Sequence, residues 1–305
     1  MSKRKVLFII GAGHCGSSLL ALILGSHPQC FSAGELGNLP NRYRKGLYLD
    51  CVNCNSDFWD RTFGDSGLKQ LSIGLGDTRV TPYIPLKLEK NIREFLGTDR
   101  VFKPYTFMLA QLGKEVIIDA SKYWVWVDRK TKAKEFTVGE VEAYLLNLVR
   151  DGRAIVNSYL RKYPQRDMAT FTQNWMDKTK RRQEFYQSFD RGKKIEVAYE
   201  QLASDPHVTV QKICEFLEIE FTPDMIEYWK YDHHDISGND GTYSLVRRYQ
   251  QQEMLDKVKE THGEYYEKID LGIKLDLRWK KELSKEKLDI FNSIAGEFNQ
   301  PYVWD

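Results

Sequence analysis

The 305-residue chain has no long hydrophobic run, no marked excess of charge of one sign and only five cysteines. Its longest apolar run, residues 19–24, is far too short for a membrane-spanning helix, which needs about 20 apolar residues. The 45 basic and 43 acidic residues nearly balance, so no net field draws the protein to nucleic acid or to an anionic membrane. We therefore expect a soluble protein that binds neither nucleic acid nor membrane.

The N-terminus and the cysteines both favour a cytoplasmic protein. The chain begins with a basic stretch, but the apolar run that follows is interrupted at Gly11 and has no cleavage site of the secretory type. An odd number of cysteines fits a reducing compartment better than a disulfide framework. Cys51 and Cys54 form a C-x-x-C pair, but the nearest candidates, His27 and Cys30, do not supply the second pair that a zinc site needs. We expect free or buried thiols and no metal.

No repeat, low-complexity linker or shift of composition divides the sequence, so we predict one domain over residues 1–305, with a substantial core. The most informative stretch lies near the N-terminus. Residues 6–10 form an apolar run rich in β-branched side chains, which is typical of a strand buried on both faces. A glycine-rich loop, residues 11–18, and then a strong helix former, residues 19–24, follow directly.

This order of strand, glycine-rich loop and helix is the geometry that binds phosphate. Glycines let the backbone approach an anion, successive N–H groups point at it, and the helix N-terminus adds partial positive charge. The loop resembles a Walker A motif, but Ser17 stands where that motif has the lysine that reaches a β- or γ-phosphate. We therefore expect a single 5′-phosphate rather than a nucleoside triphosphate with Mg²⁺. The alternative is a structural turn in an ordinary α/β protein.

Three further apolar runs predict strands that alternate with helices, at residues 115–119, 143–149 and 194–198. This alternation favours an α/β fold with a parallel sheet covered by helices, whose ligands lie at the carboxyl ends of the strands. Ser121 and Arg150 fall at those ends, as the glycine-rich loop does. Helices are predicted at residues 82–97, 102–112, 154–161, 171–189, 210–217 and 223–229.

The strand at residues 143–149 leads into a second candidate anion site. Arg150 follows the strand, and Ser158 lies two turns into the next predicted helix, so a guanidinium fork and a hydroxyl can converge on one anion. Taken alone, the pair is more typical of an arginine that caps a loop and a serine that faces solvent. Together with the glycine-rich loop, it indicates a nucleotide with two separate phosphates.

These two motifs resemble those of sulfotransferases that use 3′-phosphoadenosine-5′-phosphosulfate (PAPS). GAGHCGSSLLALIL resembles their 5′-phosphosulfate loop, and LVRDGRAIVNSYLR resembles their 3′-phosphate motif. LDCVNCNSDFW resembles an eroded form of a Cys-rich insert in bacterial members. The resemblance spans nearly the whole chain and implies a P-loop-like α/β sulfotransferase fold. Its further segments are HPQCFSAGE with Glu35, IIDASK with Lys122, VAYEQLASDP with Tyr199, HHDISGNDGTYSLVRRYQQ with Arg247 and Arg248, and WKKELSKEKLDIFNSIAGEF.

The resemblance also implies roles for single residues. Glu35 is the expected catalytic base, although a glutamate is also common in the first turn of a helix. The family carries Lys or Arg where this sequence has His14, so either His14 as an imidazolium or Lys122 supplies the catalytic cation. The residues expected to bind the nucleotide are Gly13, His14, Cys15, Gly16, Ser17, Ser18, Arg150, Ser158 and Tyr199, with Arg247 or Arg248 completing the clamp on the 3′-phosphate.

The implied reaction transfers a sulfuryl group from PAPS to a hydroxyl or amine of a small-molecule acceptor and releases 3′-phosphoadenosine-5′-phosphate (PAP), without a metal. Cyanobacterial sulfotransferases of guanidinium-toxin pathways are one similar group, so a secondary metabolite such as a guanidinium alkaloid is one candidate acceptor. Trp124 and Trp126 are candidates for the acceptor wall. Two alternatives stay open: a P-loop nucleotide kinase, for which Asp119 is the candidate Mg²⁺ ligand, and a non-catalytic PAPS-binding protein.

Overall fold

The computed structural model describes residues 4–47, 57–76, 81, 83–190, 192–253, 256–268 and 270–304. Cys51 and Cys54, the C-x-x-C pair, lie outside the described residues. The chain forms a five-stranded sheet in the order β2-β3-β1-β4-β5, and each neighbouring pair is parallel. The predicted α/β class, a parallel sheet flanked by helices, is therefore confirmed. The strands are β1 (Lys5–Gly11), β2 (Cys30–Ser32), β3 (Val116–Lys122), β4 (Glu142–Val149) and β5 (Gly192–Ala198).

The central strand, β1, brings three strand ends to one edge of the sheet. Residues 6–10 are fully buried, as expected for an apolar strand that is covered on both faces. Lys5 is aligned with Val116 of β3 and with Glu142 of β4, and Gly11 is aligned with the end of β4. The loop after β1 therefore lies beside the ends of β3 and β4.

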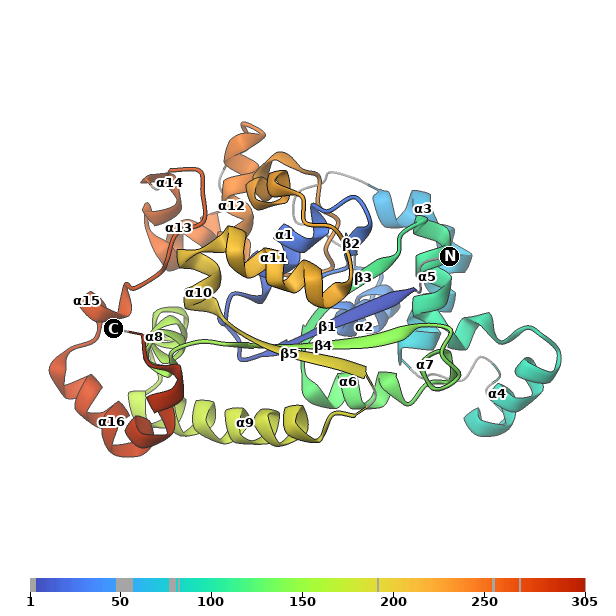
Figure 1. The fold of residues 1–305 in the computed structure, drawn as a ribbon, viewed down its shortest axis with the longest axis horizontal. Coiled ribbons are helices and arrows are strands. Elements are labelled where there is room, and N and C mark those ends of the chain that lie inside the picture. Colours follow the sequence, from blue (N-terminus) through green and yellow to red (C-terminus); the bar gives the residue numbers. More distant parts are fainter. Residues whose placement is uncertain are drawn as a thin grey trace.

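Helices cover both faces of the sheet (Figure 1). Leu7 and Ile9 of β1 join one hydrophobic core, and Val6, Phe8 and Ile10 join another. One strand thus contributes its alternating side chains to two separate cores. The helices of the first core are α1 (Ser17–Gly25), α10 (Tyr199–Ser204), α11 (Pro206–Leu217), η3 (Pro223–Lys230) and α12 (Asp240–Tyr249). Those of the second are α2 (Leu39–Arg44), α3 (Phe58–Gly76), α5 (Pro104–Leu112) and α6 (Trp124–Thr131).

A third hydrophobic core fixes α9, the helix that runs below the sheet in Figure 1. The ring of Trp175 lies 5.7 Å from that of Phe291 and 5.6 Å from that of Phe298, so α9 is held by the C-terminal helix. The helices of this core are α8 (Gly152–Lys162), α9 (Met168–Ser188), α15 (Trp279–Glu282) and α16 (Lys285–Asn299). The remaining elements are η1 (Leu36–Asn38), α4 (Leu86–Phe95), η2 (Asp99–Phe102), α7 (Lys134–Thr137), α13 (Asp256–His262), α14 (Tyr265–Lys268) and η4 (Gln300–Tyr302).

Most predicted elements are present with shifted ends, and several elements were not predicted, among them α3, β2, α6 and α12. The stretch at residues 64–76 is glycine-rich but helical. Its first residue, Gly64, has a φ of 60° and kinks α3 within the helix. The strand β2 and the helix α6 gave no clear sequence signal, because β2 has only three residues and α6 carries a mixed pattern. In the described part of the chain, no helix is long and apolar enough to cross a membrane, and no group of three or more His, Cys, Asp or Glu is arranged to hold a metal ion.

The carboxylate of Asp119, the candidate Mg²⁺ ligand of the kinase alternative, is used inside the core. One of its oxygens accepts from the Tyr105 hydroxyl at 2.7 Å and from the Trp126 indole N–H at 2.8 Å. The other accepts from the backbone N–H of Ser121 at 3.0 Å and from the hydroxyl of the same serine. Because the side chain is fully buried and its oxygens are already bonded, it joins β3 to α5 and α6 rather than facing a ligand.

We expect Asp119→Ala to lower the free energy of unfolding by about 3 kcal/mol or more, because it leaves several buried donors without an acceptor. Urea denaturation followed by circular dichroism measures the loss. The control is Asp128→Ala, which removes a carboxylate of α6 that pairs with Lys132 near the surface; exposed pairs of this kind contribute about 0–1 kcal/mol. Equal losses in the two variants would contradict the structural role of Asp119.

Candidate functional site

A large cavity opens at the edge of the sheet where β1, β3 and β4 end. Its volume is about 1050 Å³, at the upper end of the range of small-molecule sites, which leaves room for a nucleotide and a second small molecule. The glycine-rich loop, the ends of β3 and β4, and the helices α8 and α9 form most of its wall. Segments 238–245 and 262–278 complete the wall.

The glycine-rich loop turns sharply from β1 into α1. Gly16 has a φ of 94°, and a Cβ built there would lie 2.5 Å from the ring of Tyr199, so both the backbone and the available space require glycine. His14 also adopts a left-handed conformation, with a φ of 66°. The helix α1 begins at Ser17, so the partial positive charge of its N-terminus falls at the loop. The loop has the geometry of an anion site.

Arg150 lies where β4 ends and is almost completely buried. Its Nη1 donates to the backbone oxygen of His14 at 2.8 Å, and its Nη2 donates to the backbone oxygen of Asp276 at 3.1 Å. The guanidinium stacks on the ring of Tyr199, with its carbon 4.1 Å from the ring centroid. Its Nε has no hydrogen-bond partner among the described residues. The arginine therefore joins the loop to the C-terminal segment and still has a donor to offer.

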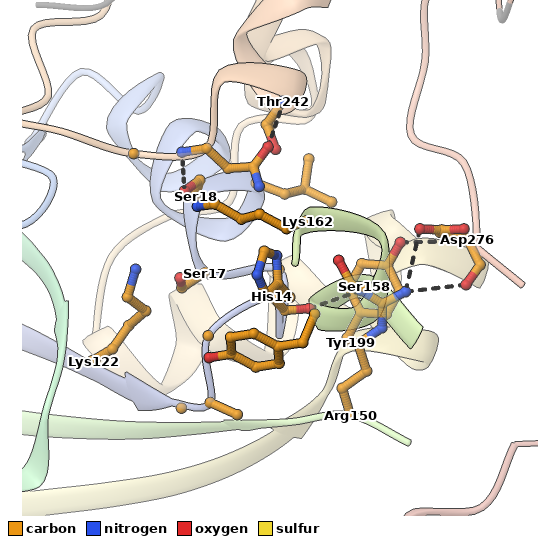
Figure 2. A pocket seen from close by; sticks show the side chains of 18 of the residues that line it. His14, Ser17, Ser18, Lys122, Arg150, Ser158, Lys162, Tyr199, Thr242 and Asp276 are labelled. Carbon is orange, nitrogen blue, oxygen red and sulfur yellow. Dashed lines mark hydrogen bonds and ion pairs between the residues drawn. The ribbon is translucent and has the colours of Figure 1, made fainter. Parts of the chain in front are cut away.

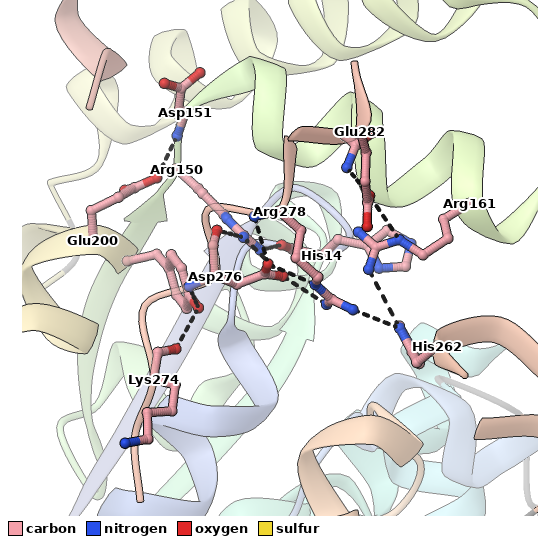
Figure 3. A network of polar contacts seen from close by, with 12 residues as sticks. His14, Arg150, Asp151, Arg161, Glu200, His262, Lys274, Asp276, Arg278 and Glu282 are labelled. Atoms are coloured by element: carbon pink, nitrogen blue, oxygen red, sulfur yellow. Dashed lines mark hydrogen bonds and ion pairs between the residues drawn. The ribbon is translucent and has the colours of Figure 1, made fainter. Parts of the chain in front are cut away.

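A polar network surrounds this arginine (Figure 3). Asp276 accepts from Nε of Arg278 at 2.8 Å and lies 3.5 Å from Nη2 of Arg150. Although burial opposes it, the bonds and charge of Arg278 and the charge of Arg150 hold the pKa of Asp276 well below its ordinary value. Burial, with the charges of Arg278 and Arg161, lowers the pKa of His262 to about 4, so this histidine is neutral near pH 7. The network thus joins Arg150, Arg161 and Arg278 to two carboxylates, those of Asp276 and Glu282, and to one neutral imidazole.

Glu35 and Lys122 form an ion pair in the cavity wall. Lys122 ends β3 with a left-handed φ of 70°. Gly34, with a φ of 64°, positions Glu35, and a Cβ built on Gly34 would lie 2.8 Å from the backbone nitrogen of Ile236. The Asn38 side chain donates to the second carboxylate oxygen of Glu35 at 3.0 Å. The carboxylate is thus held beside a lysine and at the rim of the same cavity as the loop.

The segment that follows Ile236 supports both the loop and Glu35. The backbone N–H of Glu35 donates to the carbonyl of Ile236 at 2.7 Å. Three residues further along, the backbone N–H of Asn239 donates to the Ser18 hydroxyl at 3.0 Å, as Figure 2 shows. Ser237 between them has a φ of 63°, so this segment also has a strained backbone.

His14 is placed to be neutral rather than cationic. Its ring lies edge-on to that of Tyr159, with centroids 4.6 Å apart. Burial first, and then the charges of Lys162, Arg150 and Lys122, lower the pKa of His14 to about 3. Figure 2 shows Lys162 extending from α8 toward the loop. Of the two alternatives for the catalytic cation, this arrangement favours Lys122 over His14.

The cavity brings together most of the predicted site residues. Cys15 is the exception within the loop, because it is buried beneath it and does not line the cavity. Arg247 and Arg248 are also not among the described residues that line it: their guanidinium groups donate to the backbone oxygens of Glu253 and Tyr266, each at 2.8 Å. The predicted residues that line the cavity are Gly13, His14, Gly16, Ser17, Ser18, Glu35, Lys122, Arg150, Ser158 and Tyr199. Of the two tryptophans, Trp124 lines the cavity, whereas Trp126 is buried and bonds Asp119.

Sequence reasoning missed most of the cations of this site, among them Lys162 and Arg278. Lys162 lines the cavity one helical turn after Ser158, a spacing that places both on the same face of α8. Arg278 lies immediately before the WKKEL segment, and the Asp276-x-Arg278 spacing was the available signal for a paired arginine. Neither residue is part of a motif whose local pattern indicates a ligand.

A model of the sulfotransferase family matches residues 133–223, which contain β4, α8, α9, β5 and α11. The match covers Arg150 and Ser158 and confirms the resemblance to sulfotransferases that the sequence motifs indicate. It supports a sulfotransferase activity for this chain. No curated protein sequence matches the chain.

The solved structures that are similar to the chain include three sulfotransferases. The sulfotransferase domain of the Synechococcus PCC 7002 olefin synthase is 18% identical, with a TM-score of 0.47, and the match covers 97% of this chain and 96% of that one. The sulfotransferase domain from the curacin biosynthetic pathway is 14% identical, with a TM-score of 0.49 and full coverage of both chains. A sulfotransferase from Mycobacterium avium is 11% identical, with a TM-score of 0.45, over 100% of this chain and 78% of that one. All three are distant neighbours.

We expect Gly16→Ala to weaken the binding of PAP by at least about tenfold, or 1.4 kcal/mol, because the new methyl group displaces Tyr199 and with it the stacked Arg150. Calorimetry measures the affinity. The matched control is Gly113→Ala: Gly113 also has a positive φ, 62°, but a Cβ there meets nothing within 4 Å. The control carries the same kind of backbone strain and should keep the affinity. Equal affinities for the two variants would exclude the loop as the anion site.

Proposed function

We propose that the protein is a PAPS-dependent sulfotransferase that transfers a sulfuryl group to a hydroxyl or amine of a small-molecule acceptor and releases PAP. One observation carries the proposal: a single cavity is lined both by the glycine-rich loop and by Arg150 with Ser158, which follow two adjacent parallel strands. Two anion sites at neighbouring strand ends suit a nucleotide with phosphates at both its 5′ and its 3′ positions.

The residues of the cavity fit this donor. The loop, with the N-terminus of α1 and the hydroxyls of Ser17 and Ser18, suits the 5′-phosphosulfate. Arg150 and Ser158 suit the 3′-phosphate, and Arg278, which shares Asp276 with Arg150, adds charge at the same end. Nine lysines and arginines but only two carboxylates are found among the described residues that line the cavity, which favours a strongly anionic ligand.

In the proposed reaction, the acceptor oxygen or nitrogen attacks the sulfur in line with the oxygen of the 5′-phosphate. The new bond to sulfur forms as the bond between sulfur and that oxygen breaks, and the phosphate leaves as part of PAP. Glu35 accepts the proton of the acceptor. Lys122 and Lys162, together with the loop N–H groups, stabilise negative charge on the sulfuryl oxygens and on the leaving phosphate. A sulfuryl group carries one negative charge, so these cations are sufficient and the mechanism needs no metal.

We expect PAP to bind tightly and 5′-AMP weakly, and we expect Arg150→Ala to cost about 1.5–3 kcal/mol of PAP binding, the worth of a hydrogen bond to a charged group. Calorimetry of PAP, 5′-AMP and ATP–Mg²⁺ on both proteins measures this. Since Arg150 also bonds His14 and Asp276, Ser158→Ala serves as a milder variant that removes only one hydroxyl. Preferred binding of ATP–Mg²⁺, or no discrimination between PAP and 5′-AMP, would overturn the proposal in favour of a kinase or a structural loop.

We expect Glu35→Gln to lower kcat by about 10²–10⁴-fold, because the amide cannot accept the proton, while the affinity for PAP is kept. Transfer from radiolabelled PAPS to the best of a panel of phenols, alcohols and amines measures the rate. Glu140→Gln is the control, since it also removes a carboxylate that pairs with a lysine, Lys103 at 3.0 Å, and neither of these two residues lines the cavity. Undiminished transfer in Glu35→Gln would exclude this residue as the base, and absence of transfer in the parent protein would favour a non-catalytic role.

A further inference from the structure

The helix α9 turns a basic stripe toward the cavity. Lys178, Arg181 and Arg182 are spaced so that they share one face of the helix, and all three line the cavity. Trp175 and Asn174, one turn earlier, line it as well. A helix that faced only an apolar pocket would not need three cations on this side, so the stripe requires an explanation.

The cations of this wall have no carboxylate partner in the described part of the chain. Arg182, although only 5% exposed, donates to the neutral oxygens of Asn147 at 3.2 Å and of Thr179 at 3.1 Å. Arg166, which precedes the helix, stacks against the ring of Tyr163 at 5.7 Å instead of meeting an acid. Glu196 acts on Arg182 only from a distance, through Asn147, which donates to it at 2.7 Å, and a buried guanidinium without a direct ion pair is costly. The arrangement is therefore suited to an anion that arrives with a ligand.

The donor, as proposed, binds at Arg150 and Arg278 rather than at this stripe. There, Arg150 and Arg278 already share Asp276. PAPS brings roughly four negative charges, fewer than the nine cationic side chains that line the cavity, and two of these nine are matched by the lining carboxylates. An excess of positive charge is left for a second ligand.

The stripe lies on the acceptor side. Trp124 follows the Lys122 end of β3 by two residues, and its ring lies 5.7 Å from that of Phe185 on α9. The contact between Trp124 and Phe185 therefore joins the Lys122 end of β3 to α9. In the proposed reaction, the acceptor loses its proton to Glu35, which pairs with Lys122. Tyr123 and Trp124, which directly follow Lys122, add aromatic side chains to the cavity wall.

We propose that the acceptor is an anion: a compound whose hydroxyl or amine reaches Glu35 while a carboxylate or a phosphate monoester elsewhere in the molecule binds Lys178, Arg181 and Arg182. The inference rests on the proposed function and names its substrate class. Charge-assisted, forked bonds to such a group are the strong ones available in this wall. A guanidinium acceptor would meet like charges here, so the stripe disfavours a cationic alkaloid.

Four phenols of similar shape test the charge requirement: 3-(4-hydroxyphenyl)propanoate, its amide, tyramine, and 2-(4-hydroxyphenyl)ethyl phosphate. Calorimetry on the full chain saturated with PAP measures their affinities. We expect the carboxylate or the phosphate to bind at least about tenfold more tightly than the amide, and tyramine to bind most weakly. Comparing the affinity of the propanoate with that of the phosphate shows which of the two kinds of anion the site prefers. Equal or tighter binding of the amide or of tyramine would overturn the inference.

The double variant Lys178→Gln/Arg181→Gln should reduce the preference for the anionic phenols to within about threefold. Lys180→Gln is the matched control, because Lys180 lies on the same helix with its amino group over the Phe298 ring, 5.4 Å from the centroid, and does not line the cavity. PAP affinity should stay within about twofold in all variants. A preference that survives in the double variant overturns this inference alone, whereas failure of PAP to bind the parent protein overturns the proposed function and this inference with it.

Discussion

The site depends on how the repulsion between the positive charges around one cavity is balanced. Nine lysines and arginines face the space at the edge of the sheet, and their mutual repulsion must be balanced before any ligand enters. Asp276 does this at one end by bonding Arg278 and facing Arg150. Glu35 does it at the other by pairing with Lys122. Elsewhere in the wall, Arg182 is held by the neutral side-chain oxygens of Asn147 and Thr179 rather than by a carboxylate.

The same constraint explains why the loop carries a histidine. A lysine or arginine at position 14 would add a further cation beside Lys162, Arg150 and Lys122, whose charges already help burial to depress the pKa of His14. A neutral imidazole packed against Tyr159 keeps the loop in its left-handed turn without that repulsion. In the proposed reaction, Lys122 of β3 and Lys162 of α8, two elements that are distant in the chain, take the place of the lysine or arginine expected in the loop.

The sequence was sufficient for those parts of the site that depend on local backbone geometry. The run from residue 6 to residue 24 predicts strand, loop and helix because each step has a local cause: apolar burial, glycine at positive φ and helix propensity. Arg150 and Ser158 were found in the same way, from a strand end and a helical spacing. The α/β fold followed from the alternation of such units.

What the sequence could not predict depends on how helices rotate against one another. The motif around residue 247 was found by resemblance, but its two arginines donate to backbone oxygens and do not line the cavity. Lys162, Arg278 and the stripe of α9 line the cavity because the third hydrophobic core, centred on Trp175, fixes the faces of α8 and α9. No local pattern encodes that rotation. The small strand β2 was missed because three residues give too short a signal.

One short segment, residues 236–239, has a mechanical consequence for the order of events. Its first residue accepts from the backbone N–H of Glu35, and its last donates to the hydroxyl of Ser18, which also lines the cavity. The two hydrogen-bonded residues, Ile236 and Asn239, are three positions apart. Ser237 between them has a φ of 63°, so the short segment is conformationally restricted. Under the proposed function, a donor that bonds the Ser18 hydroxyl therefore acts on the same segment that holds Glu35, which couples the position of this carboxylate to the occupancy of the loop.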